Sequence, residues 1–297
     1  MPLFGIDVSK WNGRIHFAGL KNAGVRFAFI KASQGHALTS DHYLFADSRF
    51  AENVEGFAGV GIPVGAYHFF TASDEAEADR EADFFLDVCR PLADHLTLYL
   101  ACDAEVYGNR WLEGLGRAAL SALIARFCCR VEAAGFAACH YTNTDHIKNR
   151  IDLDAIPFPV WQAHYPGGGT VKKPADAGAA LAVHQYTDRG QLIGVPGQFD
   201  LNFGYAPIAR RIIRLRTPLE EQTLDYIARY PTGEAILTRM ADKLVLRGLR
   251  TVRDDSHPRL VSLLRYHLGL TEEECAYLDA YAWHVELFRK LYDSLRP

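Results

Sequence analysis

Apolar residues follow two alternating patterns up to about residue 205 of the chain. One pattern is a short run that is apolar at nearly every position, which is typical of a parallel β-strand covered on both faces. Such runs predict strands over residues 3–8, 25–31, 63–69, 98–103, 137–141, 159–163, 182–186 and 198–202. The other pattern has apolar residues three and four positions apart, as on one face of an α-helix. It predicts helices over residues 41–60, 73–90 and 115–134.

Eight predicted strands with helices between them, over about 200 residues, indicate the α/β class and a (β/α) TIM-like barrel. Parallel strands need a long crossover between them, and a helix usually provides it. The helical segments become short after residue 141. We therefore expect an irregular barrel with reduced helices in its second half.

The pattern changes near residue 217, beyond which only helical periodicity is present. Residues 217–229, 232–249, 257–268 and 271–295 are predicted to be helices, and the last begins with a capping box of Thr271 and Glu274. We expect two domains, with residues 1–210 forming the barrel and residues 217–297 a small all-α accessory domain. The arginine-rich segment 209–216 is expected to join them.

Composition narrows the class of protein. The 297 residues are 49% hydrophobic and 23% charged, and the formal net charge of −4 provides no attraction to nucleic acid. No apolar stretch approaches the roughly 20 residues of a transmembrane helix, so we expect neither a nucleic-acid partner nor membrane insertion. The first residues lack the basic and apolar regions of a signal peptide, which predicts synthesis in the cytoplasm. The six cysteines have no CxxC spacing, and the adjacent Cys128 and Cys129 are expected to be buried reduced thiols.

Two carboxylates, Asp103 and Glu105, follow the apolar run of residues 99–102. Residues two apart on a strand point the same way, with Cα atoms roughly 6–7 Å apart. Neighbouring carboxylates repel and burial penalises their charge, so the pKa of one is expected to rise. One group then donates a proton while the other stays ionised, which predicts acid/base catalysis. The same residues also fit a strand that simply ends at a solvated loop.

Acidic, amide and aromatic residues also gather at the other predicted strand ends. Barrel enzymes place their chemistry at the C-terminal ends of strands, so these side chains predict one cleft of acids and aromatics, as in sites for sugars. The candidates beyond the carboxylate pair are Asp7, Lys31, Tyr67, Asn143, Trp161, Tyr165, Gln185, Tyr186 and Asp200. Their structural alternatives are barrel core for the aromatics, backbone partners for the amides and an Asx turn at Asp200. No HxxxH or HExxH spacing occurs, so neither a metal nor a cofactor is expected.

Eight short motifs occur in a fixed order along the barrel region. They are GIDVS (5–9), WNG (11–13), FIKASQG (29–35), GAYHF (65–69), DAE (103–105), WQAHY (161–165), QYT (185–187) and GQFDLN (197–202). In this order, over about residues 3–205, they resemble the family 25 glycoside hydrolases, the lysozyme-type N-acetylmuramidases. Two positions depart from the family pattern: Gln34 stands where Glu is frequent, and Asn12 where Gln is common.

The resemblance implies a flattened barrel that cleaves the β-1,4 bond between N-acetylmuramic acid and N-acetylglucosamine in peptidoglycan. By position, Glu105 would be the general acid/base, and Asp103, Asp7 and Asp200 the other carboxylates of the site. The reaction would be retaining. Either Asp103 orients the substrate's acetamido group as internal nucleophile, or Asp103 or Asp200 attacks directly.

Two other functions remain open on the sequence. The same scaffold suits a non-catalytic glycan-binding protein, or a hydrolase of another amino-sugar polymer such as chitin. Without a signal peptide, a muramidase would reach the bacterial cell wall by a lysis system or specialised export. The helical domain would then serve as an adaptor for a delivery partner.

Overall fold

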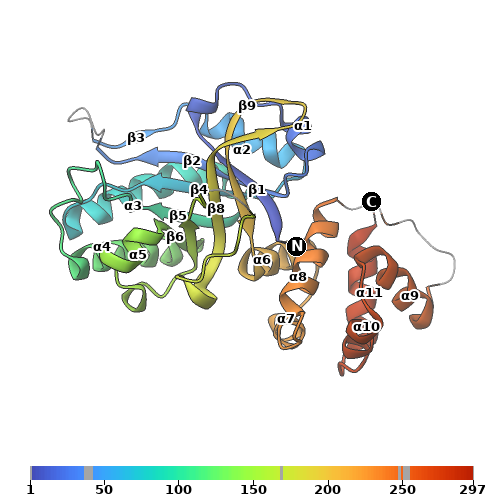
Figure 1. The fold of residues 1–297 in the computed structure, drawn as a ribbon. Helices are drawn as coiled ribbons and strands as arrows, with labels where there is room; N and C mark the ends of the chain where they lie inside the picture. Colours follow the sequence, from blue (N-terminus) through green and yellow to red (C-terminus); the bar gives the residue numbers. More distant parts are fainter. Residues whose placement is uncertain (1, 37–42, 168–169, 247–248, 250–254, 297) are drawn as a thin grey trace. The chain divides into compact units, whose positions relative to one another are not determined.

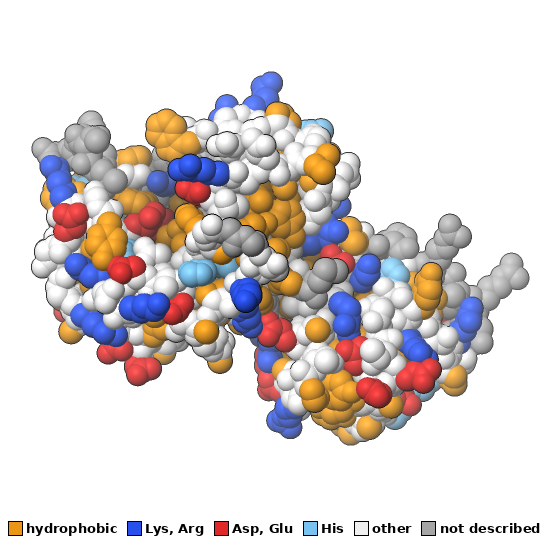
Figure 2. Space-filling view, viewed as in Figure 1, with side chains coloured by type: hydrophobic (Ala, Val, Ile, Leu, Met, Phe, Trp, Pro, Cys, Tyr) orange, Lys and Arg blue, Asp and Glu red, His pale blue; other side chains and the backbone are white. Residues whose placement is uncertain are grey.

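The computed structural model describes residues 2–36, 43–167, 170–246, 249 and 255–296 (Figure 1). The chain forms two compact units: a barrel unit, Phe4–Phe203, and a helical unit, Gly204–Pro297 together with Met1–Leu3. None of the described helices has the length and apolarity needed to cross a membrane. On the face shown in Figure 2, acidic and basic side chains are interspersed over both units.

Eight strands close the barrel, as the sequence predicts. The parallel ladder runs through β1 (Leu3–Val8), β2 (Phe27–Gln34), β4 (Val64–Phe69), β5 (Leu96–Asp103), β6 (Ala137–Asn143), β7 (Val160–Ala163) and β8 (Leu181–Leu192). The last strand, β9 (Val195–Gly204), lies between β8 and β1 and completes the ring. All eight predicted strands overlap an observed one, and the α/β barrel is confirmed.

The ring closes through a hairpin. Only Ile193 and Gly194 connect β8 to β9, which is too short for a crossover, so β9 runs antiparallel to β8. Gly194 has a φ of 78°, a conformation that suits glycine in such a tight turn. Because of this reversal, the first half of β9 lies beside the C-terminal end of β1, where Asn12 Nδ2 donates a 3.1 Å hydrogen bond to the Gln198 carbonyl.

Helices cover the first half of the barrel and shrink in the second, as predicted (Figure 1). The first half carries α1 (Phe17–Asn22), α2 (Phe50–Gly59), α3 (Glu75–Cys89) and α4 (Arg117–Ala133), with short 3-10 turns at Lys10–Asn12 and Arg90–Leu92. In the second half, the described residues form α5 (Thr144–Asn149) and 3-10 turns at Leu153–Ala155 and Gly178–Ala180. The predicted helices 73–90 and 115–134 correspond to α3 and α4.

One predicted barrel helix is wrong in its first half. Of residues 41–60, residues 41–42 lie outside the described residues, Phe45–Ala46 form the short strand β3 antiparallel to β2, and α2 begins only at Phe50. The reason is Asp47, whose carboxylate accepts hydrogen bonds from the backbone N–H groups of Arg49 and Lys10. That local turn ends the strand and delays the helix. Of the cysteines, all six are free thiols, but Cys129 is exposed, contrary to the prediction.

The helical unit contains α6 (Ala206–Arg216), α7 (Glu221–Ala228), α8 (Gly233–Leu246), α9 (His257–Leu268), α10 (Glu272–Asp279) and α11 (His284–Leu295). The arginine-rich segment 209–216 lies within α6, which has buried isoleucines and packs against α8. Predicted helix 271–295 is divided in two at Tyr281. The Tyr281 carbonyl accepts hydrogen bonds from both the backbone N–H and the Nδ1 of His284, in place of a continuing helical partner.

Candidate active site

A hydrogen-bonded cluster joins Asp7, Gln185, Asp200 and Asn202 inside the barrel. Asp7 Oδ2 accepts hydrogen bonds from Gln185 Nε2 and Asn202 Nδ2, both at 2.8 Å. Gln185 Nε2 also lies 3.4 Å from Asp200 Oδ2. Asp7 and Asn202 are 195 residues apart in the chain. The fold therefore brings two of the predicted acids together, with two amides between them.

Aromatic side chains determine which way the two amides face. Tyr141 and Tyr165 donate hydrogen bonds to Gln185 Oε1, at 2.8 and 2.6 Å. The Trp161 indole N–H donates to Asn202 Oδ1 at 2.8 Å. With both amide oxygens occupied by donors, the amide NH₂ groups point to the acids. Three aromatic residues thus orient the amides that hold the acid cluster.

The second pair of acids, Asp103 and Glu105, lies at the end of β5, and we call it the strand-end pair. Burial raises the pKa of both carboxyls, and for Asp103 the neighbouring Glu105 raises it further. Asp103 is 6% exposed, and its Oδ1 has no hydrogen-bond partner among the described residues. A buried acceptor without a partner is rare and marks a position where a ligand group can donate.

Lys31 opposes these shifts. Its positive charge acts to lower the pKa of both carboxyls of the strand-end pair, although burial lowers the pKa of Lys31 itself. Lys31 Nζ donates a 2.8 Å hydrogen bond to Gln34 Oε1 and lies 5.0 Å from the centre of the Phe69 ring. Because Gln34 is neutral, it holds the ammonium group without cancelling its charge, which remains available to the carboxylates.

Asp7 and Asp200 titrate as a pair. Burial, followed by the nearby Asp200, raises the pKa of Asp7 well above its usual range. Burial also raises the pKa of Asp200 to about 6, while its hydrogen bond with Asp7 acts to lower it. Two close carboxyls do not both ionise readily, and the stronger burial of Asp7 favours the proton on Asp7 over Asp200.

A cavity of about 350 Å³ opens beside Glu105, within the size range of small ligand pockets. Its lining residues are Glu105, Tyr141, Asn143, Thr144, Asp145, Ala163, His164 and Tyr165. Tyr165 lines this space and is 47% exposed. Sequence reasoning did not select Thr144, Asp145 or His164, although all three lie next to predicted strand ends.

Three residues that the sequence suggests as substrate contacts have structural roles. Trp161 is 2% exposed and packs against Phe29 at 4.6 Å between ring centres, so it belongs to the barrel interior. Tyr186 follows Gln185 on β8 and therefore faces the opposite side, where it stacks on Phe203 at 4.5 Å. Asn143 Oδ1 caps α5 by accepting from the backbone N–H of His146.

Tyr67 and Lys31 do lie with the acids. Burial raises the pKa of the Tyr67 phenol, and Asp7, Asp103 and Asp200 raise it further, which places this side chain within the field of both acid pairs. Among the described residues of the barrel, no three His, Cys, Asp or Glu groups lie close enough together to hold a metal ion. The barrel site is thus a set of carboxyls, amides and aromatics around a small cavity.

The chain is similar to known proteins over most of its barrel unit. The family model "Glycosyl hydrolases family 25" matches residues 6–195. The autolytic lysozyme of Clostridium acetobutylicum is 28% identical over 198 residues, covering 67% of this chain. That alignment covers 54% of the relative, so the chain spans about half its length.

Solved structures agree with the sequence match. The Clostridium perfringens spore cortex lytic enzyme SleM is 27% identical, with a TM-score of 0.58 and coverage of 68% of this chain and 67% of that one. A family 25 glycosyl hydrolase from Bacillus anthracis is 26% identical, with a TM-score of 0.56 and coverage of 68% and 88%. The family match spans most of the barrel unit and contains Asp7, Asp103 and Glu105. The chain belongs to family 25 of the glycosyl hydrolases.

Proposed function

We propose that this chain is a lysozyme that cleaves the β-1,4 bond between N-acetylmuramic acid and N-acetylglucosamine in peptidoglycan, and that it acts at the bacterial cell wall. The observation that carries the proposal is the meeting of four carboxyls from β1, the end of β5 and β9 at one barrel mouth, beside a cavity for a sugar. Membership of family 25 and the lysozyme among its relatives support the same substrate.

Glu105 is the proposed general acid/base. Its raised pKa keeps a larger fraction of the carboxyl protonated than in an exposed glutamate, and it lines the cavity. In the first step Glu105 donates its proton to the glycosidic oxygen as the bond from that oxygen to the anomeric carbon breaks. In the second step the glutamate takes a proton from the attacking water, which restores the starting state.

Asp103 is the proposed partner of the substrate's acetamido group. Its partnerless Oδ1 accepts a hydrogen bond from the acetamido N–H, while the acetamido carbonyl oxygen attacks the anomeric carbon. The cyclic intermediate is then opened by water, with overall retention of configuration. Asp7 and Asp200, which accept hydrogen bonds from Gln185, are the proposed remaining carboxyls of the site. Direct attack by Asp103 or Asp200 is the rival route.

Muropeptide release from purified sacculi tests the function. Glu105→Gln removes the proton donor at constant size, and turnover should fall by at least about 100-fold. Glu132→Gln, at an exposed position on α4, is the matched control and should retain wild-type turnover. A wild-type chain that binds sacculi without releasing muropeptides would be a glycan-binding protein. Release from chitin but not from sacculi would reassign the substrate.

Two measurements separate the routes. Proton NMR of the first product anomer establishes retention, which both retaining routes share. Glycan strands lacking the N-acetyl group should not be cleaved if the acetamido oxygen is the nucleophile. Efficient cleavage of those strands would instead favour attack by an aspartate.

The helical unit is the proposed adaptor for a delivery partner, since it is compact by itself and the family match ends before it. A chain ending at Gly204 should retain turnover on sacculi in solution, because all the acids of the site precede that residue. This end point is preferable to residue 216, because a chain ending there keeps α6 without the helix α8 that covers it. Loss of turnover in a folded truncated chain would show that the unit takes part in hydrolysis.

A further inference from the structure

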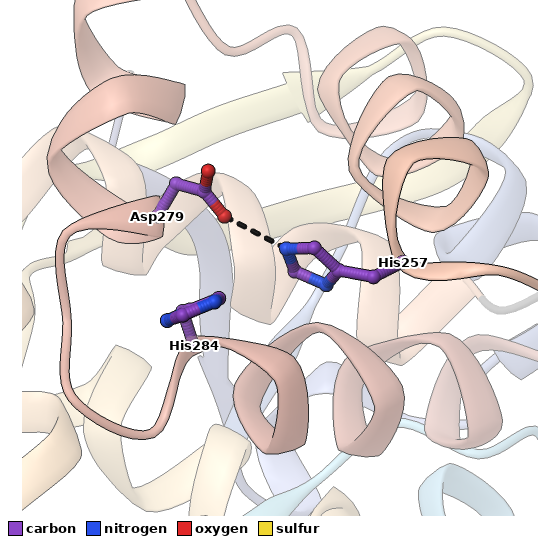
Figure 3. A group of neighbouring side chains, drawn as sticks. All are labelled: His257, Asp279 and His284. Carbon is purple, nitrogen blue, oxygen red and sulfur yellow. Dashed lines mark hydrogen bonds and ion pairs between the residues drawn. The ribbon is translucent and has the colours of Figure 1, made fainter.

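We propose that the helical unit binds one Zn²⁺ ion between His257, Asp279 and His284 (Figure 3). His257 is the first residue of α9, Asp279 the last of α10 and His284 the first of α11. One potential ligand atom of each residue lies within 4.8 Å of the other two. Figure 3 shows the three side chains converging from three separate helix ends.

The hydrogen bond of His284 prepares it as a ligand. Its Nδ1 lies 2.8 Å from the Tyr281 carbonyl oxygen, which can only accept, so Nδ1 carries the proton. In the neutral ring the lone pair is then on Nε2, the form that coordinates a metal. Histidine ligands in metal sites are commonly oriented in this way by a backbone carbonyl on the other ring nitrogen.

His257 and Asp279 already face each other. His257 Nε2 and Asp279 Oδ1 are 2.8 Å apart and share a hydrogen bond. Zn²⁺ would take the place of the proton on His257 Nε2, and the neutral ring would then carry its proton on Nδ1, which has no hydrogen-bond partner among the described residues. Ligand atoms at bonds of about 2.0–2.1 Å around a tetrahedral zinc are about 3.3 Å apart. Each pair of atoms therefore has to change its separation by no more than about 1.5 Å, within reach of side-chain rotation.

The ligand chemistry favours a first-row transition ion over Mg²⁺ or Ca²⁺. Two imidazoles and one carboxylate form a mixed nitrogen and oxygen set suited to zinc, whereas the alkaline-earth ions prefer oxygen alone. The Asp279 side chain is 50% exposed and that of His257 25%, so water can reach the fourth position.

The consequence would be structural. His257 and Asp279 are 22 residues apart, and one ion would tie together the start of α9, the end of α10 and the start of α11. The carboxylate also offsets part of the ion's charge. Zinc would thus stabilise the arrangement of the last three helices, without a part in the acid/base chemistry of the barrel.

The test uses the full chain, stripped of metal with a chelator and then dialysed. Isothermal titration should show one Zn²⁺ bound with a dissociation constant in the micromolar range or below, and zinc should raise the melting temperature. His284→Ala should weaken binding by at least about 100-fold, and Asp279→Asn by about 10-fold or more. His95→Ala, which removes an exposed barrel histidine, is the matched control and should bind zinc as the wild type does.

Asp279→Asn also controls for weakened binding that results only from unfolding. It keeps an acceptor for His257 and alters a half-exposed side chain, so its far-UV circular dichroism without zinc should equal that of the wild type. Cobalt(II) replacing zinc should give the absorption of a four-coordinate site, which Asp279→Asn changes. The proposal is overturned if the stripped wild-type chain binds zinc no better than millimolar. It is equally overturned if His284→Ala and Asp279→Asn both bind as tightly as wild type.

Discussion

Asp200→Asn is expected to stabilise the barrel while it impairs the site. Burial is the main reason that the pKa of Asp200 rises from an ordinary value of 3.8 to about 6. One pKa unit corresponds to about 1.4 kcal/mol between the two protonation states, so ionised Asp200 lowers the free energy of unfolding at pH 7 by at most about 3 kcal/mol. Partial solvent exposure screens the charge and reduces this limit. Asparagine has the same shape and carries no charge.

The sign of the pH dependence follows from the raised pKa. A carboxyl of this kind contributes stability below its unfolded-state pKa and loses it as the pH rises through the folded-state value. Relative to Asp200→Asn, the free energy of unfolding of the wild type should therefore fall between about pH 4 and pH 6 and stay constant above that range. At pH 4 the free energy of unfolding of Asp200→Asn is expected to exceed that of the wild type by only about 0.5 kcal/mol.

Urea unfolding of both chains across this pH range measures the effect. Three of the four tryptophans lie in the barrel unit, so a Trp283→Phe background makes fluorescence report on the barrel alone. Asp94→Asn, at an exposed position, is the matched control and should change stability by less than about 0.5 kcal/mol. If Asp200→Asn destabilises the barrel at pH 7, or changes its stability equally at both ends of the range, burial of the Asp200 charge does not cost stability.

Three further changes probe separate parts of the molecule. Lys31→Met removes a charge that lowers the pKa of both carboxyls of the strand-end pair, so both limbs of the pH–rate profile should move to higher pH. A profile that does not move would show that Lys31 does not set these pKa values. Trp161→Phe removes the 2.8 Å hydrogen-bond donor to Asn202, so both the free energy of unfolding in urea, by about 1–3 kcal/mol, and kcat should fall. If neither changes, Trp161 does not position Asn202. Arg239→Met breaks a 2.6 Å ion pair with Glu274 and should lower the free energy of unfolding of the helical unit by about 1–3 kcal/mol, seen as a lower melting temperature. Turnover on sacculi should stay unchanged, and a loss of turnover would contradict the separation of the helical unit from catalysis.

Local patterns were sufficient to predict most of the secondary structure. Near-continuous apolar runs identify the barrel strands because both faces of a parallel strand are buried, and α3 and α4 follow from their periodicity. The same periodicity continued across two breaks, at Asp47 and at Tyr281, and predicted helices that are too long. Hydrogen bonds from single polar side chains make those breaks, and hydrophobic spacing carries no information about them.

The sequence also predicts the strand-end pair, since residues two apart on an extended chain share a face, although β5 ends at Asp103 and Glu105 lies just beyond it. The same rule, applied to neighbours, shows that Gln185 and Tyr186 face opposite sides of β8. The meeting of Asp7 with Asp200 depended instead on the hairpin that reverses β9, a feature of the whole barrel.

The sequence by itself thus determined the barrel class, the position of the helical region and which acids are the candidates for the chemistry. Only the tertiary structure decided which acids lie close enough to raise each other's pKa, which amides hold them, and that His257, Asp279 and His284 converge. The physical reason is range. Alternation along a strand or helix acts over a few residues, whereas these contacts depend on how distant elements pack, and nothing in their spacing along the chain records that packing.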